Sequence, residues 1–133
     1  MHHDRKLLMK RILVIEDEPA IRLGIARLLA SKGFHVFEAP DGRIGLLLSE
    51  TLQPDLILCD INLPVLDGFG ILRQVRRNLT TASIPFVVLT SQTNEEIHQR
   101  SLELGASHFL SKPINFNELL TVVNHQLELA TSL

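Results

Sequence analysis

The sequence predicts an α/β domain, in which a parallel sheet is covered by helices on both of its faces. Short apolar runs alternate along the chain with longer amphipathic stretches, which is the pattern of βα units around a parallel sheet. The short runs are continuously apolar, as expected for strands that are covered on both faces. The chain has 133 residues, of which 45% are hydrophobic, so it is long enough for one domain with a substantial core.

Five apolar runs are predicted to be the strands, and helical spacing is found between them. The strands are expected at residues 11–16, 35–38, 55–59, 85–90 and 108–111. The first helix should begin with Pro19 in its first turn and end near Gly33, with an apolar stripe of Ile21, Ile25, Leu28 and Leu29. Asp41 is expected to cap the second helix. The third helix is expected to bury Ile71, Leu72, Val75 and Leu79.

The fourth helix differs from the others because its apolar stripe is thin. It opens with Thr93-Asn94-Glu95-Glu96, which matches a capping box, and it should end near Gly105. Its strongly apolar residues are only Ile97, Leu102 and Leu104. A weakly anchored helix is a candidate for a moving part, although a short helix at the sheet edge would show the same pattern. The fifth helix should begin at Asn115, with Glu118 three residues on, and carries Phe116, Leu119, Leu120, Val123 and Leu127.

The composition excludes several classes of function. A net charge of −2 and the absence of tryptophan and tyrosine argue against direct nucleic-acid binding. The single cysteine, Cys59, cannot form an internal disulfide, which fits a reducing cytoplasm. No apolar run approaches the length of a membrane span, and the N-terminus lacks the pattern of a signal peptide. We therefore expect a cytoplasmic protein without membrane contact, with a flexible lead-in at 1–9, a domain at 10–130 and a tail at 131–133.

Polar residues end or follow four of the five predicted strands. Glu16 ends the first strand and Asp17 follows it, Asp60 follows the third strand, Thr90 ends the fourth, and Lys112 follows the fifth. The carboxyl ends of parallel strands meet at one edge of a sheet, where ligands bind in such folds. A single Asp after a strand is most often a helix cap or a turn residue, but the joint occurrence of these groups indicates one shared site.

These residue types suit phosphoryl transfer with a divalent metal ion. Glu16 and Asp17 are adjacent and repel each other unless a cation relieves them, and ligands with only oxygen donors suit Mg²⁺. Asp60 would complete the metal site and also be the nucleophile, since a carboxylate can attack a phosphoryl group to give an acyl phosphate. Lys112 supplies a cation and Thr90 a hydroxyl donor for the transferred group. Asp60, Thr90 and Lys112 are therefore the expected catalytic residues.

In combination, these motifs resemble the receiver domain of two-component response regulators. The resemblance covers roughly residues 10–130 and rests on four segments: Glu16-Asp17, Asp60-Ile61-Asn62-Leu63-Pro64-Val65-Leu66-Asp67-Gly68, Thr90-Ser91 and Gly105-Ala106-Ser107-His108-Phe109-Leu110-Ser111-Lys112-Pro113. It implies a doubly wound, three-layer αβα fold with a five-stranded parallel sheet in the flavodoxin-like order 2-1-3-4-5. Two helices would cover one face of this sheet and three the other.

The resemblance also implies how the site works. Asp60 would take a phosphoryl group from the phosphohistidine of a sensor histidine kinase or a histidine phosphotransfer protein, with Mg²⁺ as the required cofactor. Asp17 and Asp60 would ligate the metal directly, Asn62 through its backbone carbonyl, and Glu16 directly or through water. The chain would not be a conventional enzyme, because it would catalyse only its own phosphorylation and dephosphorylation.

Two residues are implied to form the switch. Thr90 would turn its hydroxyl toward the phosphoryl group, and Phe109, three residues before Lys112, would move inward behind it. Phe109 has no phenol hydroxyl, so burial would be the only force that draws it inward. A core position in both states is the alternative for Phe109. By the same resemblance, the bond between Lys112 and Pro113 is a cis peptide.

Asn62 and Gln92 are expected to set the lifetime of the phosphoryl group. They stand two residues after Asp60 and two after Thr90, where a side chain can control the attacking water. Neither is a carboxylate that could act as a strong base, so we expect slow to moderate self-hydrolysis. Cys59 should point away from this site into the core, because neighbours on a strand face opposite sides.

The sequence is thus interpreted as a receiver domain, stand-alone or excised from a longer protein, that works as a phosphorylation switch. Phosphorylation would bias two shapes of the face formed by the fourth helix, the fifth strand and the fifth helix, which would bind a downstream protein or a second copy.

An aspartyl-nucleophile phosphohydrolase is disfavoured by Asn62, because enzymes resembling the haloacid dehalogenases carry a second acid there. A flavodoxin-like nucleotide binder is disfavoured by acids where a glycine-rich phosphate loop would stand. A phosphorylation-independent binding module is the remaining alternative.

Overall fold

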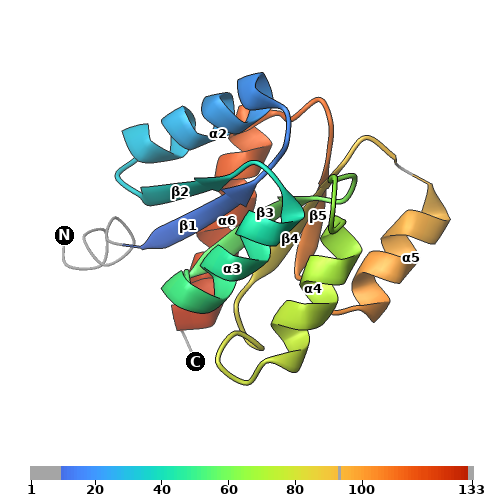
Figure 1. Ribbon diagram of the computed structural model, residues 1–133. Coiled ribbons are helices and arrows are strands. Elements are labelled where there is room, and N and C mark those ends of the chain that lie inside the picture. Colours follow the sequence, from blue (N-terminus) through green and yellow to red (C-terminus); the bar gives the residue numbers. More distant parts are fainter. Residues whose placement is uncertain (1–9, 93, 132–133) are drawn as a thin grey trace.

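The structure is a computed structural model that describes residues 10–92 and 94–131. Strands and helices alternate along the chain (Figure 1). The strands are β1 (Arg11–Ile15), β2 (His35–Ala39), β3 (Leu56–Asp60), β4 (Phe86–Thr90) and β5 (His108–Ser111). The helices are α2 (Pro19–Ser31), α3 (Gly42–Leu52), α4 (Gly68–Arg77), α5 (Glu95–Glu103) and α6 (Phe116–Thr131). All five predicted strands form, and their ends lie within one residue of the prediction.

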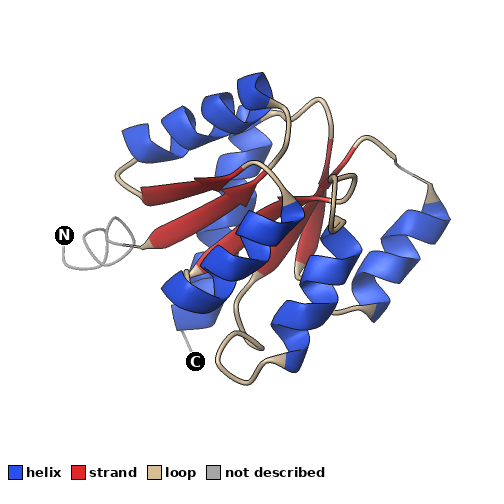
Figure 2. Ribbon diagram, in the orientation of Figure 1, coloured by secondary structure: helices blue, strands red, loops and turns tan. Residues whose placement is uncertain are grey.

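The five strands make one parallel sheet in the order β2-β1-β3-β4-β5. Helices α2 and α6 cover one face of the sheet, and α3, α4 and α5 cover the other (Figures 1 and 2). Successive residues of β1 face opposite sides, so that Ile12 and Val14 join the core under α2 and α6, while Leu13 and Ile15 join the core under the other three helices. The predicted three-layer fold and its strand order are confirmed.

Most of the predicted helix ends are where the capping residues indicated. Pro19 is the first residue of α2, and Gly33 follows its end with a φ of 95°, a left-handed conformation that glycine adopts without strain. The Asp41 carboxylate accepts a hydrogen bond from the Ile44 N–H at 2.9 Å and caps α3. The Asn115 side chain accepts one from the Glu118 N–H at 3.0 Å at the start of α6. These local bonds satisfy donors that the first helical turn leaves without a partner.

The prediction for Leu79 is wrong. Helix α4 ends at Arg77, and Leu79 lies beyond it with 95% of its surface exposed. The Asn78 side chain accepts hydrogen bonds from the N–H and the hydroxyl of Thr80, and the Thr81 hydroxyl donates to the Val75 carbonyl. Such local side-chain bonds compete with the helix, which is why the apolar spacing did not extend it.

The start of α5 also differs from the predicted capping box. Asn94 is the N-cap, and its side chain accepts a hydrogen bond from the Ile97 N–H at 2.9 Å. Thr93, from which the predicted box would begin, lies outside the described residues, as do the lead-in at 1–9 and residues 132–133 of the tail. Only Ser101 of α5 is buried, so the thin stripe predicted for this helix is confirmed. In the described part of the chain, no helix has the length and apolar character needed to cross a membrane.

Candidate functional site

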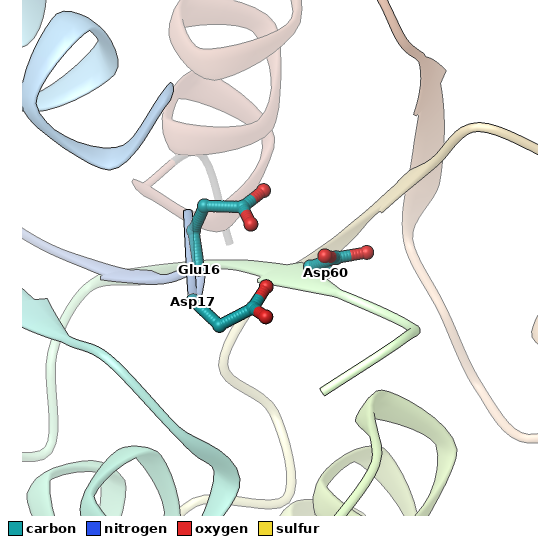
Figure 3. A group of neighbouring side chains, drawn as sticks. All are labelled: Glu16, Asp17 and Asp60. Carbon is teal, nitrogen blue, oxygen red and sulfur yellow. The ribbon is translucent and has the colours of Figure 1, made fainter. Parts of the chain in front are cut away.

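The polar residues that end the strands meet at one edge of the sheet, as the parallel topology requires. Glu16 and Asp17 follow β1, and Asp60 ends the neighbouring strand β3. Each of these three acids offers an oxygen within 4.8 Å of the oxygens of the other two. Figure 3 shows the two carboxylates at the end of β1 turned to the side on which Asp60 lies. Thr90 ends β4, and its register partner Ser111 immediately precedes Lys112.

Asp60 is held from two sides. Only 4% of the residue is exposed. One carboxylate oxygen accepts a hydrogen bond from the Asn62 N–H at 3.2 Å, and the other accepts one from the Lys112 ammonium at 3.1 Å. These two bonds fix the position of the carboxylate, which is the group that can act as a nucleophile.

Lys112 bridges the two buried acids. Its Nζ lies 2.6 Å from Glu16 Oε1 and 3.1 Å from Asp60 Oδ2. Burial by itself would lower the pKa of Lys112, but the hydrogen bond to Glu16 and the charge of Asp60 outweigh it, and this pKa is raised. The ammonium is therefore a fixed positive charge beside the carboxylate of Asp60.

The carboxyl of Glu16 has a strongly raised pKa. The residue is fully buried, and its second oxygen accepts a hydrogen bond from the Glu18 N–H at 3.1 Å. Burial raises the pKa of the Glu16 carboxyl from 4.5 to about 7, because loss of water outweighs the bonds to Lys112 and Glu18. Asp17, by contrast, is exposed. The pair thus presents one acid inside the protein and one at its surface.

The loop after β3 is drawn tightly against Asp60. A Cβ on Gly68 would lie 2.4 Å from the backbone oxygen of Asp60, so only glycine fits there. The Gly68 N–H donates to the Ile61 carbonyl at 2.8 Å, and the Asp67 carboxylate caps α4 by accepting from the Gly70 N–H at 2.9 Å. This loop includes Asn62, which is exposed beside the site.

Thr90 lies at the edge of the site, with its hydroxyl engaged elsewhere. The residue is fully buried. Its hydroxyl accepts a hydrogen bond from the Gln92 N–H at 2.9 Å and donates to the Gln92 carbonyl at 3.1 Å. Gln92 itself is exposed. The hydroxyl would have to leave the Gln92 carbonyl before it could donate to a ligand at Asp60.

Phe109 is partly buried and packs against the core under α3, α4 and α5. Its ring lies against the ring of His98 from α5, with 3.8 Å between the centroids. Sequence reasoning missed this contact, because no local pattern signals that a residue of α5 lies over one of β5. It also missed Arg22, which donates to the Glu16 carbonyl at 2.8 Å.

Two expectations about neighbouring residues hold. Cys59 is fully buried and its side chain belongs to the core on the face of α3, α4 and α5, and burial, followed by the charges of Asp60 and Glu16, raises the pKa of its thiol. The peptide bond between Lys112 and Pro113 is cis.

An apolar groove lies next to the site. On one side it is formed by α2, and on the other by the segment that joins β5 to α6; its lining residues are Ala20, Ile21, Gly24, Ile25, Lys112, Pro113, Ile114 and Phe116. Phe116 is 45% exposed, although the sequence placed it on the apolar stripe of α6. Lys112 belongs both to the groove and to the carboxylate site.

Comparisons with known proteins agree with this geometry. A model of the response regulator receiver domain family matches residues 12–124. The transcriptional regulator RpaA of Synechocystis is 39% identical over 115 residues, which are 86% of this chain but 48% of RpaA, so the chain spans about half of that relative. PilH of Pseudomonas aeruginosa is 32% identical, with 87% of this chain and 96% of PilH covered.

A solved structure adds a metal ion to the comparison. The receiver domain of the sensor histidine kinase PA1611 from Pseudomonas aeruginosa superposes with a TM-score of 0.84 at 29% identity, covering 90% of this chain and 98% of that domain. That domain holds a magnesium ion in its active-site cleft.

Proposed function

This chain belongs to the response regulator receiver domain family of two-component systems, and on that premise we propose that it is a switch in which Asp60 accepts the phosphoryl group. The observation that carries the proposal is the position of Asp60, which is held by Lys112 at 3.1 Å within reach of two further carboxylates. Receiver domains are phosphorylated by histidine kinases or phosphotransfer proteins. We propose such a protein as the phosphodonor of this chain, in the cytoplasm.

The donor set fits Mg²⁺. Three carboxylates with converging oxygens face a single ammonium, so the site has an excess of negative charge and only oxygen ligands, which suits a hard divalent ion. Glu16, Asp17 and Asp60 would hold the ion, with the backbone carbonyl of Asn62 as a further ligand. When bound, the ion would supply positive charge to the oxygens of the transferred phosphoryl group.

The proposed transfer uses the residues around Asp60 directly. A carboxylate oxygen of Asp60 attacks the phosphorus, the bond between phosphorus and the histidine nitrogen of the donor breaks, and its electron pair stays on the imidazole, which can take up a proton. Lys112 neutralises negative charge next to the phosphoryl group. The result is an acyl phosphate on Asp60.

The switch would then act through Thr90 and Phe109. The Thr90 hydroxyl would exchange its bond to the Gln92 carbonyl for one to a phosphoryl oxygen. Gln92 lies two residues before Asn94, the N-cap of α5, so this exchange would act on the entry to α5. Phe109 would move into the space that Thr90 leaves. We propose that the face of α5, β5 and α6 changes in this way and binds a downstream protein or a second copy.

The lifetime of the phosphoryl group is expected to depend on Asn62 and Gln92. Both are exposed beside the site, and neither can serve as a strong base toward water. We predict that Asn62→Asp or Gln92→Glu will change the rate of decay, measured by intact mass at intervals after the phosphodonor is removed. Glu18→Gln, which changes an exposed acid near β1, is the control. An unchanged decay rate in both variants would sink this assignment.

The first test is phosphorylation by a small donor. The protein is incubated with Mg²⁺ and acetyl phosphate and its intact mass is measured, with Asp60→Asn and a sample without metal in parallel. We expect one phosphoryl group to be added only when both Mg²⁺ and Asp60 are present. Folded protein that takes up none would contradict the proposal and favour a phosphorylation-independent binding module. Turnover of a generic phosphate monoester would instead favour a phosphohydrolase.

A further inference from the structure

The contact between His98 and Phe109 joins helix α5 to the proposed switch residue. The centroids of the two rings are 3.8 Å apart, and the rings are tilted by 31°. His98 belongs to α5 and Phe109 to β5, which are separate elements on the same side of the molecule (Figure 1). At this distance the imidazole covers one side of the Phe109 ring, so Phe109 cannot move without losing the contact.

Contacts of this kind are a large part of what holds α5 in place. Ser101 is its only buried residue, and Ile97 is partly buried. The Arg100 guanidinium lies 4.6 Å from the centre of the Phe69 ring on α4. Because α5 buries so little apolar surface, the stack on Phe109 is one of a small set of contacts that can fix its position.

The stacked arrangement also carries an unfavourable feature. Nε2 of His98 is buried and has no hydrogen-bond partner among the described residues. A buried polar atom without a partner is destabilising. The ring contact favours the present position of Phe109, and the unpaired nitrogen offsets part of that free energy.

We infer that His98 is a positioning residue that holds Phe109 in its resting place and thereby sets how much of the unphosphorylated protein already has the active shape. This inference rests on the proposed function, because it gives His98 a role in the equilibrium that phosphorylation of Asp60 displaces. A ligand that prefers the active shape binds with an apparent affinity that depends on the fraction of protein in that shape. His98 therefore tunes the phosphorylation response without touching the phosphoryl group.

Two substitutions of His98 should change the active fraction in opposite directions. His98→Ala removes the ring contact together with the unpaired nitrogen that partly offsets it, so it should raise the active fraction by at most about tenfold, the equilibrium factor that corresponds to one aromatic pair. His98→Phe keeps a ring over Phe109 and removes the unpaired nitrogen, so it should lower the active fraction. A residue with only a structural role would not move the equilibrium in opposite directions.

The test is a titration of the 133-residue chain with beryllofluoride, a mimic of the phosphoryl group, in the presence of Mg²⁺, followed by NMR of the Phe109 ring. We expect His98→Ala to bind beryllofluoride more tightly than the natural chain, and its free Phe109 signals to be displaced toward their bound position. His98→Phe should bind more weakly. His125→Ala, which removes an exposed histidine from α6, should behave like the natural chain.

A double-mutant cycle makes the test specific. In a Phe109→Leu background, the effect of His98→Ala on beryllofluoride affinity should disappear, because the ring on which it acts is gone. Equal effects in both backgrounds, or unchanged affinity and Phe109 signals in His98→Ala, would overturn the inference and leave the proposed function intact. If the natural chain and Asp60→Asn fail alike to bind beryllofluoride, the proposed function itself is wrong. Amide spectra of each variant establish that it is folded.

Discussion

At the scale of single residues, Glu16 is a buried acid whose ion pair does not compensate fully for the loss of water. Its partner Lys112 lies at 2.6 Å, yet the pKa of the Glu16 carboxyl is raised to about 7. Removing a charged group from water is costly, and here one ammonium is shared between two carboxylates. The protein therefore holds a proton on Glu16 under mildly acidic conditions.

This raised pKa predicts that stability falls as the pH increases in the absence of metal. Between pH 4.5 and 7 the unfolded chain has lost the Glu16 proton while the folded protein keeps it, so raising the pH through this window favours unfolding. The loss should be on the order of 3 kcal/mol, at about 1.4 kcal/mol for each unit of pKa. It is measured by urea unfolding at several pH values with EDTA present.

Glu16→Gln is the matched comparison for this prediction. Its side chain stays neutral, so the difference in unfolding free energy between it and the natural chain should vary across the window and level off above pH 7. Parallel pH profiles for the two proteins would rule out the assignment. Added Mg²⁺ should reduce the slope for the natural chain, because a metal favours the ionised carboxylate.

Val65 is a second residue whose local state has a measurable consequence. It lies in the loop after β3 with a φ of 71°, and 79% of its surface is exposed. This left-handed conformation is unfavourable for a β-branched residue, and here little burial offsets the strain. The sequence did not reveal it, because valine is a residue that normally favours extended backbone.

Replacing Val65 by a residue that tolerates this conformation should stabilise the protein. We expect Val65→Gly or Val65→Asn to raise the free energy of unfolding by about 1 kcal/mol, measured in urea. Val65→Ala should gain less, because alanine lacks both the freedom of glycine and the local hydrogen bonds by which an asparagine side chain tolerates the left-handed conformation. If alanine stabilises as much as asparagine, the gain does not come from the backbone conformation.

At the scale of elements, Arg76 joins the end of α4 to two connections, one that directly follows α4 and one that lies 29 residues further along the chain. From α4, its guanidinium donates to the Gly105 carbonyl at 2.9 Å, to Ala82 at 3.0 Å and to Ile84 at 2.7 Å. It thus ties the end of α4 to the connection that leads into β4 and to the turn between α5 and β5. The planar fork of arginine makes this set of bonds possible.

Replacing the Arg76 guanidinium should destabilise the folded protein. Arg76→Lys should lower the free energy of unfolding by roughly 1–3 kcal/mol, because lysine cannot reach all three carbonyls and leaves some without a partner. Arg77→Lys changes the exposed neighbour and should cost less than about 0.5 kcal/mol. Urea unfolding of the two variants decides the matter, and equal values would contradict the role given to Arg76.

At the scale of the whole molecule, the site adjoins an apolar groove that is separate from the face proposed to bind a downstream partner. The apolar groove is lined by α2 and by the segment from Lys112 to Phe116, whereas the other proposed surface is the face of α5, β5 and α6. Lys112 lines the groove and contacts Asp60. A phosphohistidine protein that docks in the groove would bring its imidazole to the acceptor while leaving α5 free to move.

This arrangement predicts that a protein donor and a small donor can be separated by mutation. Phe116→Ser removes the exposed aromatic of the groove and should slow transfer from a kinase or phosphotransfer protein that phosphorylates the natural chain, by about tenfold, as for an interface aromatic. Phosphorylation by acetyl phosphate should be unchanged. Leu102→Ser, on α5, is the control and should alter neither rate. Equal slowing with both donors would show that Phe116 acts on the site and not on docking.

The sequence by itself determined the layered fold, the five strands, most helix caps and the set of residues at the carboxyl edge. These features depend on local rules: continuous apolar runs form strands, Asp41 and Asn115 cap the helices that follow them, and parallel strands bring their ends together. The prediction that Leu79 is buried in the third helix was also wrong for a local reason. The side chains of Asn78, Thr80 and Thr81 form hydrogen bonds that the spacing of apolar residues does not indicate.

Only the tertiary structure decided which of these residues are buried, which form ion pairs and which side chains of different elements are in contact. Glu16 and Asp17 are neighbours of the same type, yet one is fully buried against Lys112 and the other is exposed. The stack of His98 on Phe109 has no counterpart in the sequence pattern. Such contacts join residues of different elements, and they depend on the angle and depth at which helices pack on the sheet. Local propensity does not specify these quantities, whereas packing of the complete core does.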